Sequence, residues 1–150
     1  MQTARGAYNE AGYDVQTMRL ATVPFSRLLG PQPVQAADLV RLSQEIETVA
    51  AGWDLAYVSL GPACVDDPAS YAAIPEAVAA TRNVFFSGQM STADGRLSLA
   101  GVRLCADVIH RLAPLEANGF ANLRFTAAAN VPPGAPFFPA AYHAGEQPAF

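Results

Sequence analysis

Segments with a strand pattern alternate with segments with a helix pattern along most of this sequence. Short runs rich in apolar and β-branched residues, typical of strands, lie at 15–22, 55–60, 83–92 and 121–129. Between them, apolar residues recur at three- and four-residue spacing, which is typical of helices that cover a sheet. This alternation predicts an α/β fold of repeated βα units with mainly parallel strands.

Helices are expected between the strands at about 34–52, 66–83 and 97–113, and a short helix is expected before the first strand. The middle helix is expected in two pieces. Asp67 would cap the first piece, and Pro75 would lie in the first turn of the second. Residues 1–150 are therefore expected to form a single α/β segment without a second domain.

The chain carries few charges, and this limits the classes of partner. Only 15% of its residues are charged, against roughly 25% in ordinary soluble domains. All nine basic residues are arginines scattered along the chain, and the net charge is −4, which argues against nucleic-acid binding. Without a signal peptide, a lipidation motif or an apolar run of about 18 residues, no membrane association is expected and the cytoplasm is the expected location. The low charge also predicts that a partner chain or further copies of this chain cover part of the surface.

Neither cysteine is expected to act as a nucleophile or a metal ligand. Cys64 and Cys105 are far apart and lack the paired spacing of zinc sites. The carboxylates of Asp66 and Asp67 should raise the pKa of the Cys64 thiol, and Cys105 lies on the apolar stripe of the last helix. His110 lies off that stripe and is expected to be solvated.

Polar residues follow each expected strand, and ligands of parallel sheets bind beyond the carboxyl ends of the strands. We expect ligand contacts from Ser59, Gln89, Ser91 and Asn130. The Ser–Gly–Thr stretch at 87–95 also resembles a phosphate loop, but it lacks the P-loop spacing. Asp94 within it would repel an anion, so we expect Asp94 to cap the following helix instead.

His143 is the strongest single candidate for a catalytic residue. It follows Phe137, Phe138 and Tyr142, and this apolar setting favours the neutral imidazole that can act as a general base. Glu146 could orient His143, or join it on a metal ion, although two ligands fall short of a coordination set and no metal is expected. The alternative is a histidine that packs in a structural loop and bonds to backbone.

Three stretches resemble the DUF711 family, also called UPF0210, whose bacterial and archaeal members have no assigned activity. They are AGYDVQTMRLATVPF, IPEAVAAT and NLRFTAAANVPPGAPFFPAAYHAGEQPAF, and FFPAAYH is the most specific part. Family members are much longer, so the resemblance implies that this chain is the amino-terminal portion of a larger barrel domain. It also implies a fold like the ten-stranded α/β barrel of the pyruvate formate-lyase glycyl radical enzymes. The radical signature of those enzymes lies near their carboxyl terminus. The resemblance therefore implies their architecture and not their radical mechanism.

Three functions remain open on this basis. The first is an uncharacterised enzyme with a pocket at the strand carboxyl ends and the His143 loop. The second is a non-catalytic sensor that binds a small molecule in the same pocket. The third is a structural subunit completed by another chain or by copies of itself. The sequence specifies no cofactor for any of them.

Overall fold

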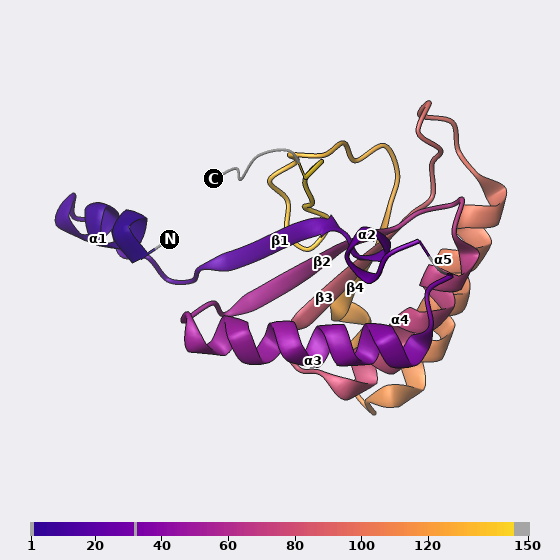
Figure 1. Ribbon diagram of the computed structural model, residues 1–150, viewed down its shortest axis with the longest axis horizontal. Coiled ribbons are helices and arrows are strands. Elements are labelled where there is room, and N and C mark those ends of the chain that lie inside the picture. Colours follow the sequence, from indigo (N-terminus) through magenta and orange to yellow (C-terminus); the bar gives the residue numbers. More distant parts are fainter. Residues whose placement is uncertain (1, 32, 146–150) are drawn as a thin grey trace.

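The computed structural model describes residues 2–31 and 33–145. Helices alternate with strands along the described chain, as Figure 1 shows. In chain order the elements are α1 (Gln2–Glu10), β1 (Arg19–Pro24), α2 (Phe25–Leu29), α3 (Ala36–Gly52), β2 (Tyr57–Ala63), α4 (Pro68–Ala80), β3 (Val84–Gln89), α5 (Leu99–Leu112), η1 (Ala113–Leu115), η2 (Phe120–Arg124) and β4 (Phe125–Ala128).

The four strands form one sheet in the order β1-β2-β3-β4, and every neighbouring pair is parallel. The order in space is therefore the order in sequence. Sheets that bind a nucleotide at a switch point reverse their order part way, whereas sequential order is the winding of α/β barrels. The predicted α/β fold of repeated βα units is confirmed.

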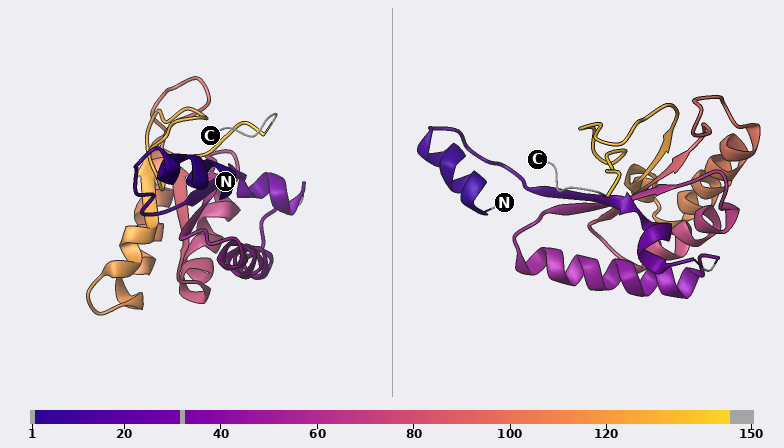
Figure 2. Two further views of the ribbon diagram at one scale, coloured as in Figure 1. Left: turned by 90° about the vertical axis from the view of Figure 1, so that its left-hand side faces the viewer. Right: turned by 45° about the horizontal axis from the view of Figure 1, so that its top comes forward.

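All three long helices pack on the same face of the sheet, which we call the helix face. Leu60, Val84 and Phe86 point to this face and are fully buried. They form one core cluster with residues from each long helix, namely Leu39 of α3, Ile74 of α4 and Val108 of α5. Figure 1 and Figure 2 show the helices gathered on this side and the carboxyl-terminal segment on the other.

Residues 130–145, which we call the closing loop, lie over the opposite face of the sheet. The ring of Phe138 packs against Phe85 of β3, with 5.0 Å between ring centroids, and against Tyr57 of β2 at 6.3 Å. The guanidinium carbon of Arg19 lies 5.2 Å from the centroid of the same ring, a cation–π distance. An aromatic cluster therefore fixes the middle of the closing loop to the sheet.

Two details of α4 differ from the expectation. The helix is continuous from Pro68 to Ala80 and contains Pro75 in its interior. Pro75 is buried together with Ile74 and Val78, so packing against the sheet offsets the hydrogen bond that an internal proline removes. Asp67 occupies the cap position, but its side chain makes no capping hydrogen bond.

The start of α5 also differs from the expectation. The helix begins at Leu99, and its cap is Ser98, whose hydroxyl oxygen accepts a hydrogen bond from Gly101 N at 3.1 Å. Asp94 instead accepts hydrogen bonds from the Thr92 hydroxyl and, at 2.7 Å, from Arg96 Nε. The prediction that Asp94 caps this helix is wrong, because the tight turn that Asp94 stabilises places it outside the first turn of α5.

Helix α1 stands apart from the sheet, as Figure 1 shows, and none of its residues is buried. Gln2 Nε2 donates to the carbonyl of Trp53 at 3.2 Å, and Arg5 pairs with Asp54. These contacts tie α1 to the turn that follows α3. Within the described residues, no helix combines the length and the apolar character that crossing a membrane requires.

Candidate functional site

A cavity of about 320 Å³, which we call the strand-end cavity, opens beyond the carboxyl ends of β3 and β4. Polar side chains from three parts of the chain meet there. Gln89, Ser91 and Thr92 come from the end of β3 and the turn after it, Asn130 from the end of β4, and Tyr142 from the closing loop. Three of the four predicted ligand-contact residues therefore line one cavity.

The register of the two strands explains why these residues meet. Gln89 pairs with Ala128 across β3 and β4, and Met90 N donates to Ala128 O at 2.7 Å just beyond the pair. Asn130 then turns with φ of 55°, a left-handed conformation that asparagine tolerates better than most residues. Its backbone N–H donates to Ser91 Oγ at 2.9 Å, which joins the two strand ends below the cavity.

Tyr142 closes one side of the cavity through two hydrogen bonds of its hydroxyl group. Gln89 Nε2 donates to the Tyr142 hydroxyl at 3.0 Å, and that hydroxyl donates to Val131 O at 3.1 Å. Burial raises the pKa of Tyr142, so the phenol stays neutral at ordinary pH. On the other side of β3, the Tyr71 hydroxyl donates to Gln89 O at 2.6 Å and fixes the backbone from which the Gln89 side chain extends.

The residues that line the strand-end cavity are all uncharged. Asp94 and Arg96, in the turn that borders it, are exposed and paired with each other. The hydrogen bond from the Thr92 hydroxyl, and then that from Arg96, lower the pKa of Asp94. The cavity therefore presents hydroxyl and amide groups to a ligand, and its lining carries no net charge.

Ser59 lies away from this cavity and has an internal partner. It is fully buried within β2, and its hydroxyl donates to Pro139 O at 2.5 Å. Strand β2 continues to Ala63, which places Ser59 in the middle of the strand beneath the closing loop. In this structure the Ser59 side chain anchors that loop.

His143 lies beside the carboxyl end of β1 and is not among the residues that line the strand-end cavity. Its backbone N–H donates to Thr22 O at 3.3 Å. Its Nδ1 is buried and has no hydrogen-bond partner among the described residues. The neighbouring Tyr142 lines the cavity, so the loop directs these two side chains differently. Glu146, the expected partner of His143, lies outside the described residues.

The pKa values of both cysteine thiols are raised. Burial, and then the Asp66 carboxylate, raise the pKa of the Cys64 thiol, while Arg27 opposes the shift. Cys105 is buried in the core, and burial raises its pKa to about 11. His110 is exposed. In the part of the chain that the structure describes, no three His, Cys, Asp or Glu residues form a group that could hold a metal ion.

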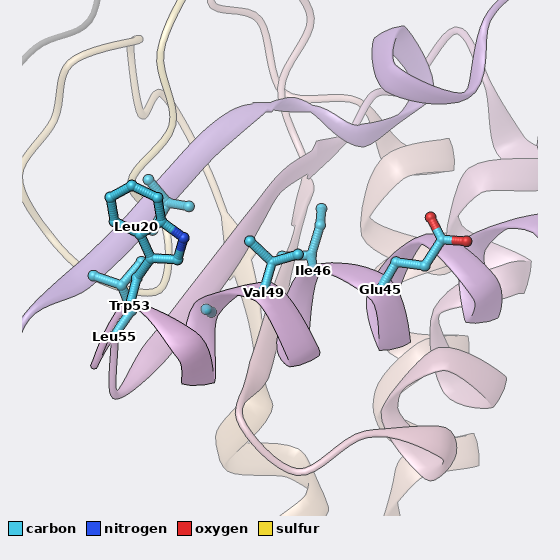
Figure 3. Close-up of a pocket in the computed structure, with 7 residues that line it drawn as sticks. Leu20, Glu45, Ile46, Val49, Trp53 and Leu55 are labelled. Atoms are coloured by element: carbon cyan, nitrogen blue, oxygen red, sulfur yellow. The ribbon is translucent and has the colours of Figure 1, made fainter.

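A second hollow, which we call the apolar groove, runs along the outer edge of the sheet between β1 and α3. Its volume is about 420 Å³, and Figure 3 shows apolar side chains along it. Leu20, Ile46, Val49, Trp53 and Leu55 line it, with Glu45 at one end. Val49 is 62% exposed and Trp53 is 64% exposed, although both are large and apolar. Glu45 is the single charged residue among the residues that line the groove.

The fold and the cavity together define an α/β protein with a sequentially ordered parallel sheet and an uncharged, polar cavity at its strand ends. A family model described as "Uncharacterised ACR (DUF711)" matches residues 1–150, and the chain belongs to this family. It is 33% identical over 141 residues to the "UPF0210 protein" of Pyrobaculum islandicum, covering 88% of this chain and 30% of that protein. The chain thus spans about a third of the length of this curated relative. No solved structure matches it.

Proposed function

We propose that this chain supplies a small-molecule pocket, and that the strand-end cavity is that pocket. The observation that carries the proposal is the convergence of Gln89, Ser91, Asn130 and Tyr142 on one cavity of about 320 Å³. Cavities of this size, with a few convergent polar groups at the carboxyl ends of parallel strands, are the usual place for ligands in α/β proteins. The proposal rests on the cavity and does not require His143 as a base.

The pocket belongs, in this proposal, to a larger barrel, such as the ten-stranded barrel of the pyruvate formate-lyase enzymes. Sequential strand order with all long helices on one face supports it, because a sheet of this kind closes on itself with its helices outside. The curated relative, of which this chain matches 30%, is long enough to supply further βα units. The closing loop and the strand-end cavity would then face the interior of the barrel.

We expect Ser91→Ala to remove about half of the thermal stabilisation that a bound metabolite gives to this chain. A ligand at one hundred times its Kd stabilises the folded state by about 2.7 kcal/mol. Loss of one hydrogen bond to the ligand would weaken its affinity by roughly tenfold. A metabolite screen read out by melting temperature measures this, with Thr3→Ala on the exposed helix α1 as the control. Equal shifts in all three proteins for every ligand would remove the cavity from consideration.

An enzyme and a sensor differ in the fate of the ligand. Chromatography of a ligand identified in that screen, after incubation with the protein, separates the two. A new product that forms with the wild type, and more slowly with Ser91→Ala, identifies an enzyme. A ligand recovered unchanged, with Kd raised by Ser91→Ala, identifies a sensor.

A structural role in a larger assembly is favoured by the apolar groove. Among the described residues, no strand pairs with the outer edge of β1. We propose that a further βα unit, equivalent to part of the remaining length of the curated relative, pairs with β1 and packs on Val49 and Trp53. Uncovered edges and apolar patches of this kind promote association.

We therefore expect the isolated 150-residue chain to self-associate at high concentration, and Trp53→Ser to reduce that association. Sedimentation velocity over a range of concentrations measures it. Tyr13→Ser is the matched control, because Tyr13 is 67% exposed and lies outside the groove. A wild-type chain that stays monomeric at high concentration would contradict this proposal.

A further inference from the structure

The hydrogen-bonding direction of Gln89 is fixed by a backbone carbonyl group. Val131 O can only accept a hydrogen bond, so the Tyr142 hydroxyl, 3.1 Å away, directs its hydrogen to Val131. The oxygen of Tyr142 is then the acceptor toward Gln89, and the group of Gln89 that faces it must be the NH₂. Gln89 Oε1 accepts no hydrogen bond from the described residues and is not a buried, unpartnered atom. This oxygen is left as an acceptor at the cavity.

The hydrogen-bonding direction of Ser91 is fixed in the same way, with the opposite result. The backbone N–H of Asn130 can only donate, so Ser91 Oγ is its acceptor at 2.9 Å. The hydroxyl hydrogen of Ser91 is therefore not needed for this contact and can be donated to a ligand. The strand-end cavity thus presents an acceptor at Gln89 and a donor at Ser91, which are two positions apart on the same chain segment.

The charge of the surroundings limits the ligand further. The lining of the cavity has no arginine or histidine that could pair with a carboxylate or phosphate, and no carboxylate that could pair with an amine. A charged group that enters such a site loses hydration without gaining an opposite charge. An uncharged polar group loses little free energy on entry, because hydroxyl and amide groups of the cavity replace the hydrogen bonds that it made to water.

We infer that the ligand of the strand-end cavity is uncharged there and carries hydroxyl or primary carboxamide groups that donate to Gln89 Oε1 and accept from the Ser91 hydroxyl. This inference rests on the proposed function, since it names the class of molecule that the proposed pocket takes. Tyr142 is a positioning residue in this scheme. It does not need to touch the ligand, because its bond to Val131 determines which end of the Gln89 amide faces the cavity.

Lactamide and lactate test the inference, because they have nearly the same size and differ in charge. Their binding to the isotope-labelled chain is followed by NMR titration of the backbone amide of Asn130 and the side-chain amide of Gln89. Propane-1,2-diol, added in a third arm, separates hydroxyl from carboxamide recognition. We expect lactamide or the diol to bind roughly tenfold more tightly than lactate. Lactate binding as tightly as both neutral probes would overturn the inference and leave the pocket in place.

A cavity that binds no ligand at all would give a result different from a cavity that binds lactate as well as the neutral probes. If neither the neutral probes nor lactate shifts the signals of Gln89 and Asn130, the proposed function falls and the inference falls with it. Selective binding of a neutral probe supports both.

Tyr142→Phe tests the positioning role. Without the hydroxyl, the Gln89 amide is free to rotate, and we expect the preference for neutral over anionic probes to fall by roughly threefold or more. Tyr13→Phe is the matched control, with an exposed ring far from the cavity lining. If Tyr142→Phe lowers the melting temperature too far for titration, Gln89→Met removes the acceptor directly and should reduce the affinity for neutral probes alone. An unchanged preference in the testable variant would overturn the inference.

Discussion

Phe86→Ala is expected to lower the free energy of unfolding by about 3–5 kcal/mol. Phe86 lies in the central strand β3, is fully buried, and packs edge-on against Phe25 with 6.2 Å between ring centroids. The paired strand residues Leu60 and Phe125 flank it, so the backbone cannot collapse into the space left by the ring. A loss of this size is a large part of the roughly 5–15 kcal/mol that stabilises a typical domain. Urea unfolding followed by circular dichroism measures the change.

Phe137→Ala is the control for this experiment. Phe137 belongs to the closing loop and is 70% exposed, so its truncation should change the free energy of unfolding by roughly 0.5 kcal/mol or less. The two variants make the same chemical change on opposite faces of the sheet. Similar losses in both would show that the core is not confined to the helix face.

The type and order of the elements could be predicted from the sequence, whereas several of their ends could not. The period of apolar residues reports which side of an element is buried, and this is a local property. The ends depend on contacts from elsewhere in the chain. The fourth strand was expected at 121–129 but forms only at Phe125–Ala128, because the residues before it wind into the short helix η2 (Phe120–Arg124). That helix holds Arg124 against the end of α4.

The candidate site could be predicted in part. Gln89 is the last residue of β3, and Ser91 and Asn130 follow strand ends. The rule that ligands lie beyond parallel strands therefore selected three residues that line one cavity. The same rule placed Ser59 at a strand end because β2 was expected to stop at residue 60. The strand continues to Ala63, and Ser59 is covered by the closing loop.

Tyr142 was not predicted as a site residue, because its place depends on how the closing loop folds back. Its hydroxyl meets Gln89, which is 53 positions away in the sequence, and no local pattern encodes that contact. The prolines of the loop favour irregular structure and do not encode its path over the sheet. The aromatic cluster of Phe138 with Tyr57 and Phe85 fixes the loop, and these contacts join residues that are distant in the sequence.

Arg124→Met is expected to lower the free energy of unfolding by about 1.5–3 kcal/mol. The Arg124 guanidinium donates to Thr81 O at 2.7 Å, and also to Val78 O, so it pairs the last carbonyl groups of α4 and places positive charge at the negative end of the helix. Burial lowers the pKa of Arg124, and the coulombic effect of Glu116 and Glu47 opposes this shift. Methionine keeps an unbranched apolar stem and removes every donor. Arg103→Met, at an exposed position of α5, is the control, and equal losses in thermal or urea unfolding would show that Arg124 does not stabilise the end of α4.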